Sequence, residues 1–183
     1  MFADLGATIL DADQIAREVV QPGTPCWQQL RTVLGPAYFE ENGTLRRREL
    51  RQRIVQDSPC RLTVNGILHP SIVHEMDRKW QALQALRSDH MVLFDIPLLF
   101  EIDLADHFDT IILVYTSREI QLQRLIQRDG LSPSEAAETL AMQLPIDTKR
   151  AKSHLVIDNS RDLSHTRQQV RAVWEKLLDQ GSL

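Results

Sequence analysis

The chain has 183 residues, of which 43% are hydrophobic and 25% charged, and its formal net charge is −4. These values are typical of one folded domain, and they argue against a nucleic-acid-binding protein, which needs a concentrated positive field. Short apolar runs argue against a membrane protein, while two distant cysteines, with no visible signal peptide, indicate reduced thiols in the cytoplasm and no zinc site.

Four short apolar segments predict parallel strands. Each is apolar or β-branched on both faces, as in a sheet that helices cover on both sides, and helical stretches separate them. The sequence therefore predicts an α/β fold with a parallel sheet flanked by helices. The predicted strands are 7–11, 91–96, 110–115 and 155–158.

Capping residues predict where several helices begin and end. Thr116–Glu119 and Ser132–Glu135 both have the spacing of a capping box, with the hydroxyl residue as N-cap. Pro145 is expected to end the second of these helices, and Asp162 is expected to cap the last helix.

Two helical stretches are too long to be single crossovers between strands. Residues 25–88 show helical periodicity without a clear strand, which predicts an inserted helical subdomain. Residues 125–153 form a smaller excursion. Helical insertions on the rim of a parallel sheet suggest a cleft that closes over ligands.

Polar residues follow each predicted strand. Ligands bind at the carboxyl ends of the strands in open parallel sheets, so these residues are candidates for a site. They are Asp11 and Asp13, then Asp95, then Thr116 and Ser117, and finally Asp158 and Asn159.

Asp13 is a candidate general base. Arg17 lies four residues later and can share its helix face, and a neighbouring guanidinium keeps a carboxylate ionised at neutral pH. The alternative is that an aspartate only caps the helix. With Asp11 beside it, one carboxylate can cap while the other takes part in chemistry.

His69 precedes Pro70, which disfavours helical backbone at the histidine and favours a helix that begins at the proline. A histidine there could donate to a ligand or simply occupy a loop. The basic run at 44–53 is typical of a solvated helix face, or alternatively of a patch that attracts a phosphorylated substrate.

A second set of cations surrounds the 125–153 excursion. Arg124 and Arg128 have i,i+4 spacing, and Lys149 follows with Arg150 and Lys152. Cations on a mobile segment can neutralise a phosphoryl group during transfer, but they can equally be surface charge on amphipathic helices.

Several segments, taken together and in order, resemble the dephospho-CoA kinases, a family of P-loop kinases. They are FADLGATILDADQIAREVVQPGTP, GTLRRRELRQRI, ILHPSI, DIPLLFE, QRDGLS and LVIDNS. The resemblance implies a P-loop kinase fold and transfer of the γ-phosphoryl group of ATP, with Mg²⁺, to the 3′-hydroxyl of dephospho-CoA. It also implies a core of 1–24, 89–124 and 154–183, a CoA-binding subdomain at 25–88 and a lid at 125–153.

The resemblance also implies roles for individual residues. Asp13 is the expected base, and Lys149 is expected to contribute to catalysis from the lid. The ATP site would include Arg124, Arg128 and Asn159. The acceptor pocket would include Arg17, His69, Pro97, Leu98, Leu99 and Glu101. The metal ligands stay open, with Asp95 a candidate by position only.

The sequence departs from this family in two places. Ser153 and His154 replace a usual alanine–aspartate pair near the lid hinge, and no GxxxxGK[ST] loop occurs in the 183 residues. About twenty family residues, comprising a strand, the phosphate loop and most of its helix, are expected before Met1. A start site assigned too late, a shortened chain or a homologue without ATP binding would each explain this, and little kinase activity is expected.

Two other functions stay open. One is a pseudo-enzyme that binds CoA or a nucleotide, and the other is a related nucleoside or nucleotide kinase. The sequence does not determine the oligomeric state.

Overall fold

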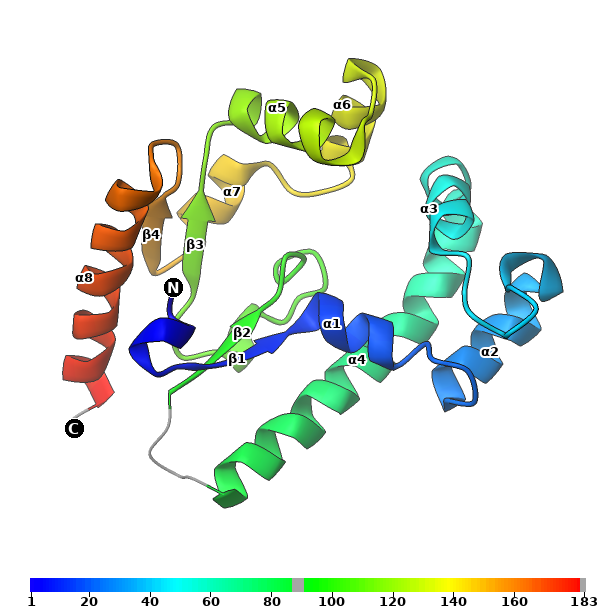
Figure 1. Cartoon of the computed structure of the whole chain (residues 1–183), viewed down its shortest axis with the longest axis horizontal. Coiled ribbons are helices and arrows are strands. Elements are labelled where there is room, and N and C mark those ends of the chain that lie inside the picture. Colours follow the sequence, from blue (N-terminus) through cyan, green and yellow to red (C-terminus); the bar gives the residue numbers. More distant parts are fainter. Residues whose placement is uncertain (87–90, 182–183) are drawn as a thin grey trace. The chain divides into compact units, whose positions relative to one another are not determined.

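The computed structural model describes residues 1–86 and 91–181. These residues form two compact units, one made of Ala7–Pro97 and the other of Met1–Gly6 with Leu98–Leu183 (Figure 1). Each unit contains one pair of parallel strands. Within the described residues, no helix combines the length and the apolar character needed to cross a membrane.

The unit Ala7–Pro97 begins and ends with strands that pair with each other. Strand β1 (Thr8–Asp11) lies parallel to β2 (Val92–Asp95), in a register that places Thr8 opposite Val92 and Asp11 opposite Asp95. The helices between them are α1 (Ala12–Glu18), α2 (Pro25–Leu34), α3 (Arg47–Gln56) and α4 (Ser58–Leu86), with a short 3₁₀ helix at Pro36–Tyr38.

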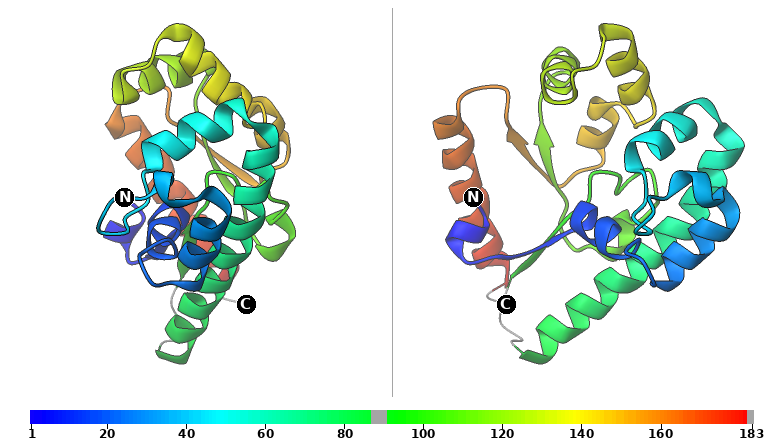
Figure 2. Two further views of the ribbon diagram at one scale, coloured as in Figure 1. Left: turned by 90° about the vertical axis from the view of Figure 1, so that its right-hand side faces the viewer. Right: turned by 45° about the vertical axis from the view of Figure 1, so that its right-hand side comes forward.

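The helical periodicity predicted between the first two strands is confirmed over residues 25–86, and residues 87–88 of that stretch lie outside the described part of the chain. Helices α2 and α3 both pack on α4, and Figure 2 shows the three gathered together. Their core consists of Val20, Cys26, Leu30, Phe39, Leu45, Leu50 and Val64. Trp27 meets Phe39 edge-on, with ring centroids 5.8 Å apart, which adds an aromatic contact to this core.

The second unit contains the other parallel pair. Strand β3 (Ile112–Tyr115) lies beside β4 (Leu155–Asp158), and Ile112 faces Leu155 in the register. The helices are α5 (Arg118–Asp129), α6 (Pro133–Ala141), α7 (Ile146–Ala151) and α8 (Leu163–Gly181), with short 3₁₀ helices at Ala3–Leu5 and Ala105–His107. Helix α8 packs against β4. The ring of Phe2 lies beside that of Trp174 in this helix, with ring centroids 6.5 Å apart.

The four predicted strands exist, but the expectation that they are buried on both faces was wrong. Ile9 of β1 is 40% exposed and Val114 of β3 is 55% exposed. Within residues 1–86 and 91–181 each sheet has two strands, and part of each sheet is left uncovered. Ile157 of β4, at 1% exposure, is a strand residue that is fully buried.

Two predicted helix boundaries were wrong. The N-cap of α5 is Ser117, whose hydroxyl accepts from the N–H of Ile120, and not Thr116. Helix α6 ends at Ala141, before Pro145, which instead precedes α7. The capping box at Ser132 and the cap at Asp162, which accepts from the His165 N–H, are confirmed.

The predicted break at His69–Pro70 was also wrong, because α4 continues through Pro70. A proline in a helix removes one N–H and crowds the carbonyl four residues earlier. That residue is Gly66, which has no side chain to crowd further, and the hydroxyl of Ser71 donates to the carbonyl of Ile67 at 2.9 Å. Packing of α4 against three other helices outweighs the local preference.

Candidate functional site

Three carboxylates gather at the carboxyl end of the β1–β2 pair. Asp11 ends β1 directly opposite Asp95, which ends β2. The Oδ1 atom of Asp11 accepts from the N–H groups of Asp13 at 2.8 Å and Gln14 at 3.0 Å. Asp11 is therefore the N-cap of α1, as the sequence allowed, and Asp13 is left exposed in the first helical turn.

The electrostatics of this cluster raise the pKa of Asp95. Partial desolvation by surrounding protein atoms is the main cause, and the negative charges of Asp11 and Asp13 add to it. The carboxyl end of these strands therefore favours a positively charged or proton-donating group.

Arg17 lies one turn after Asp13, in the last turn of α1. Its carbonyl oxygen accepts a hydrogen bond of 3.4 Å from the guanidinium of Arg47, the first residue of α3. Arg47 was not singled out from the sequence, because it belongs to the basic run that is typical of a solvated helix face. Arg47 and Arg17 are 30 positions apart in the chain, so no local sequence pattern predicts that they lie close together.

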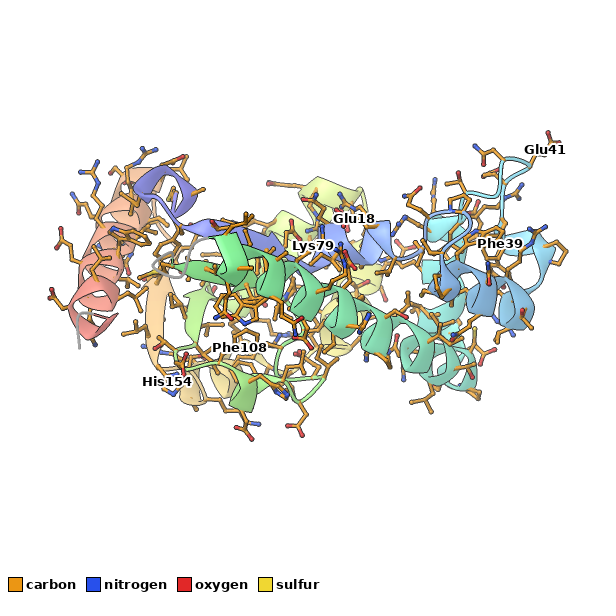
Figure 3. The ribbon with its side chains drawn as sticks, turned by 90° about the horizontal axis from the view of Figure 1, so that it is seen from below. Glu18, Phe39, Glu41, Lys79, Phe108 and His154 are labelled. Carbon is orange, nitrogen blue, oxygen red and sulfur yellow. The ribbon has the colours of Figure 1, made fainter. Side chains whose placement is uncertain are left out.

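A salt bridge holds α1 against α4. Lys79 of α4 lies 2.8 Å from Glu18 of α1, and Figure 3 shows the two side chains pointing toward each other. His69 lies further back along α4 and is partly buried, and burial lowers its pKa. A lowered pKa favours the neutral imidazole, which can donate one hydrogen bond and accept another.

The other unit contains a buried ion pair between two predicted site residues. The Nζ atom of Lys149 lies 2.7 Å from Oε1 of Glu101, and Lys149 is only 6% exposed. The same oxygen accepts from the N–H of Leu144 at 2.9 Å. Glu101 therefore links the segment after Leu98 to the α6–α7 connection through Leu144 and to α7 itself through Lys149. Its second oxygen is buried without a hydrogen-bond partner.

Arg124 and Asn159 are also brought together. The guanidinium of Arg124 donates to the carbonyl of Asn159 at 2.8 Å, and the Asn159 side chain accepts from Thr166 at 3.1 Å. Arg128 instead makes a bidentate pair with its neighbour Asp129, at 2.7 and 3.0 Å. The two arginines of α5 thus have different partners.

The remaining predicted residues lie in the turn that follows β2. Pro97 and Leu98 are exposed, whereas Leu99 is partly buried. The Leu98 carbonyl accepts from the N–H of Ile102, and the Leu99 carbonyl accepts from the N–H of Leu104, both at 3.1 Å. These two hydrogen bonds close the turn.

Sequence reasoning missed an arrangement around Tyr115, the last residue of β3. Its hydroxyl donates to Asp147 at 3.1 Å, and the guanidinium of Arg150 lies over its ring at 5.0 Å. Both partners come from α7, so Tyr115 fixes the predicted lid helix to the strand. No local pattern in the sequence predicts contacts between residues more than thirty positions apart.

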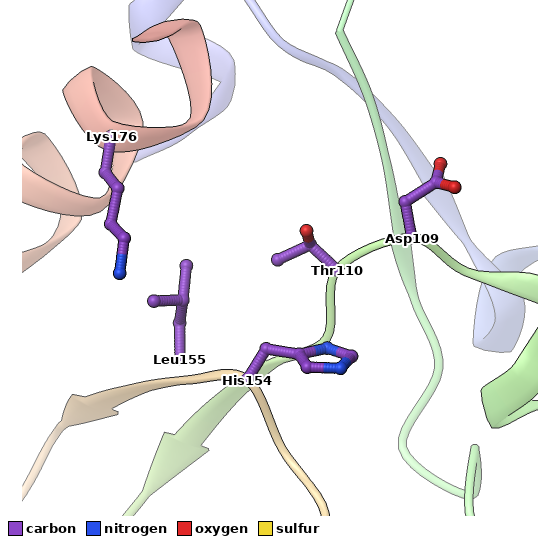
Figure 4. A pocket seen from close by; sticks show the side chains of 5 residues that line it. All are labelled: Asp109, Thr110, His154, Leu155 and Lys176. Atoms are coloured by element: carbon purple, nitrogen blue, oxygen red, sulfur yellow. The ribbon is translucent and has the colours of Figure 1, made fainter. Parts of the chain in front are cut away.

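A pocket of about 370 Å³ lies at the opposite, amino end of β3 and β4 (Figure 4). Asp109, Thr110, His154, Leu155 and Lys176 line it. Nδ1 of His154 accepts from the Ile111 N–H at 2.9 Å, so this residue, which departs from the family pattern, has a structural role. The pocket does not contain the polar residues at the carboxyl ends of these strands.

No group of three or more His, Cys, Asp or Glu side chains is arranged to hold a metal ion in residues 1–86 and 91–181. Magnesium in phosphoryl-transfer sites often takes only one or two protein carboxylates, with water and substrate phosphates completing its shell. Asp95, whose carboxyl is not used in a cap, fits that smaller requirement.

Comparison with known proteins adds independent information. The family model for dephospho-CoA kinase matches residues 1–165. A dephospho-CoA kinase from Syntrophotalea carbinolica is 39% identical over 178 residues, covering 97% of this chain and 84% of the relative. A second, from Halalkalibacterium halodurans, is 36% identical over 171 residues, covering 93% of this chain and 84% of the relative.

Two solved structures share the fold. TT1252 from Thermus thermophilus superposes with a TM-score of 0.78 at 24% identity, covering 96% of this chain and 87% of that one. The dephospho-CoA kinase from Campylobacter jejuni gives a TM-score of 0.70 at 22% identity, covering 99% and 89%. Since the family model and the relatives span most of its length, this chain belongs to the dephospho-CoA kinase family.

Proposed function

We propose that this chain carries the acceptor site and most of the catalytic groups for transfer of the γ-phosphoryl group of ATP to the 3′-hydroxyl of dephospho-CoA. The observation that carries the proposal is that two neighbouring aspartates have different structural roles. Asp11 is occupied as a helix cap, while Asp13 is exposed one turn before Arg17. Family membership supplies the reaction.

In this proposal Asp13 is the general base. Its carboxylate accepts the proton of the 3′-hydroxyl as that oxygen forms a bond to the γ-phosphorus, while the bond from phosphorus to the bridging oxygen of ADP breaks. ADP leaves with the electron pair of the broken bond. The protein contributes mainly by holding the two substrates in line and by neutralising charge.

The acceptor residues are proposed as a group. His69 lies on α4, where its neutral imidazole can exchange hydrogen bonds with a hydroxyl of dephospho-CoA. The group comprises Arg17, His69, Pro97, Leu98, Leu99 and Glu101.

The cations of the predicted lid are proposed to neutralise ATP. Arg124, Arg128 and Asn159 would lie along the nucleotide, and Lys149 would contribute to catalysis. The Lys149 amine already contacts Glu101 at 2.7 Å, so a phosphate would have to compete with that carboxylate or share the amine with it. The predicted boundaries of core, subdomain and lid remain part of this proposal.

Mg²⁺ is proposed as the metal that accompanies ATP, and Asp95 as the residue that would hold it. A bound divalent cation there supplies positive charge to the phosphates. The three-carboxylate cluster supports this role, because a cation would offset the desolvation of Asp95 and the repulsion from Asp11 and Asp13 that together raise its pKa. Two free cysteines, Cys26 and Cys60, support a reducing compartment such as the cytoplasm.

A second candidate function is suggested because the motif of the phosphate-binding loop does not occur in these 183 residues. No GxxxxGK[ST] occurs in these 183 residues, and that loop supplies backbone N–H groups and a lysine to the phosphates. The 183-residue chain is therefore expected to bind dephospho-CoA, to bind ATP weakly and to turn over slowly. On this view the 183 residues by themselves bind the acceptor without efficient phosphoryl transfer.

Calorimetry with dephospho-CoA and with ATP, together with a coupled assay of ADP release, tests both candidates. Binding of dephospho-CoA with little turnover supports the proposal for the chain as given. Normal turnover would contradict the expected inactivity and confirm the kinase. A chain that binds neither compound, although folded by circular dichroism, would overturn both functions.

A further inference from the structure

The side chain of Arg47 reaches from α3 to the backbone at the end of α1, where Arg17 lies. The guanidinium of Arg47 lies at the start of α3 and donates to the carbonyl of Arg17 at the end of α1. Repulsion from Arg17 lowers the pKa of Arg47, in addition to a larger effect of desolvation. The fold thus holds two like charges close together, which costs free energy.

No carboxylate compensates this pair. Among residues 1–86 and 91–181, neither Arg17 nor Arg47 forms an ion pair with an acidic side chain. Glu18, the acidic neighbour of Arg17, is instead bound by Lys79 at 2.8 Å. Elsewhere in this unit cations do find acidic partners, such as Arg46 with Glu40 at 3.2 Å.

The start of α3 adds to the positive field. Its first helical residues are Arg47 and Arg48, its N-cap is Arg46, and no side chain caps its N–H groups. Helix N-termini carry partial positive charge, which Glu49 in the first turn offsets only in part, so consecutive arginines there are unfavourable without an anion. This end of the helix strengthens the attraction of the arginine pair for a negative ligand.

We propose that Arg17 and Arg47 together bind the diphosphate of dephospho-CoA. This inference rests on the proposed function, and it adds a ligand group and a residue that the resemblance did not supply. Two guanidinium forks match the oxygens of a diphosphate, and an anion placed between them would cancel their repulsion.

The placement agrees with the position of the base. Arg17 follows Asp13 by four residues, which is about 6 Å along a helix axis. The diphosphate of dephospho-CoA is attached to the 5′ position of the same ribose that carries the reacting 3′-hydroxyl. One ligand can therefore span both residues of α1, with its diphosphate toward Arg47 and its 3′-hydroxyl toward Asp13.

Calorimetry on the 183-residue chain tests the inference, with Arg47→Gln as the variant and Arg48→Gln as the matched control. Arg48 is the exposed neighbour on the same helix. The ligands are dephospho-CoA, inorganic pyrophosphate and adenosine. We expect Arg47→Gln to weaken binding of dephospho-CoA and pyrophosphate at least tenfold, and to leave adenosine affinity unchanged. Arg48→Gln should change all three less than threefold.

Salt dependence provides a second measurement. The wild-type affinity for dephospho-CoA should fall with increasing salt, and Arg47→Gln should reduce that slope. Equal affinities and slopes in the two variants would overturn the diphosphate site. Pyrophosphate binding that depends on Arg47, without dephospho-CoA binding, would instead support an anion site and overturn the proposed function. Thermal unfolding of each variant confirms that it is folded.

Discussion

Asp11 accepts a hydrogen bond of 2.8 Å from the N–H of Asp13, two residues later in the chain. This contact assigns the two carboxylates to different tasks. Asp11 completes the start of α1 and also receives the N–H of Gln14, whereas the Asp13 side chain is exposed. A cap that orients the first turn of a helix also orients the side chains of that turn, so the structural aspartate positions the proposed base.

We expect Asp11→Ala to lower the free energy of unfolding by about 1 kcal/mol, because it removes an N-cap. Asp13→Asn should lower it by at most about 0.5 kcal/mol, since only attraction to the helix dipole is lost. Urea unfolding followed by circular dichroism measures both. Equal losses in the two variants would show that Asp11 is not the cap in solution.

The Lys149–Glu101 pair provides a second test, because both side chains are mostly buried. Lys149→Met should destabilise the protein by about 3 kcal/mol, since it leaves a buried carboxylate without its partner. The double variant Lys149→Met/Glu101→Gln should be more stable than the single one, because no charge then remains buried. Lys152→Met, at an exposed position in the same segment, is the control and should change stability by less than about 0.5 kcal/mol.

A double-mutant cycle separates this ion pair from simple loss of packing. Coupling between the two positions is expected, because they are in direct contact. Additive losses would mean that Lys149 contributes through its hydrocarbon chain alone, and that its charge is available to a ligand.

Local features of this chain were predictable where the interaction is local. The capping box at Ser132 and the cap at Asp162 are formed by residues a few positions apart, and the strands that end at Asp11 and Asp95 are continuous apolar runs in the sequence. Each depends on side-chain types whose preferences hold in most proteins. A predicted helix start was wrong where two suitable capping residues are adjacent, as at Thr116 and Ser117, because only the backbone conformation decides which one caps.

Distant contacts were not predictable from local patterns. Tyr115 meets Asp147, and Arg17 meets Arg47, only because helices from different parts of the chain pack together. The family resemblance named Lys149 and Glu101 separately, with roles toward different ligands, yet the structure pairs them. Such pairing depends on the tertiary fold, and a sequence motif carries no information about which members of a site contact one another.

Asp95 should give the stability of the protein a distinctive pH dependence. Its folded pKa is raised, so the folded state binds a proton more tightly than the unfolded chain. Stability from this group is therefore present at low pH and is lost as pH rises through the folded pKa. Asp95→Asn should be more stable than wild type at pH 7.5, with a smaller advantage at pH 4, in urea unfolding. Asp77→Asn, at an exposed position on α4, is the control, and its stability difference from wild type should be the same at pH 7.5 and pH 4.

His69 should act in the opposite direction. Burial lowers its folded pKa, so the unfolded chain binds the proton more tightly. Stability from this group is present at neutral pH and decreases as pH falls through the ordinary histidine range, near 6.5. His69→Gln should reduce the loss of stability between pH 7.5 and pH 5.5, whereas His74→Gln, at an exposed position on the same helix, should retain it. An unchanged slope in His69→Gln would mean that the imidazole is solvated.

Pro70→Ala tests why α4 continues through a proline. Alanine would restore an N–H donor opposite the carbonyl of Gly66 and would remove the steric conflict of the ring. The gain is partly offset, because alanine gives the unfolded chain more freedom. We therefore expect the free energy of unfolding to rise by about 1 to 2 kcal/mol, measured by urea unfolding. Helix α4 carries His69 and is packed by α1, α2 and α3, so a fall in stability would show that those contacts require the local geometry of the proline.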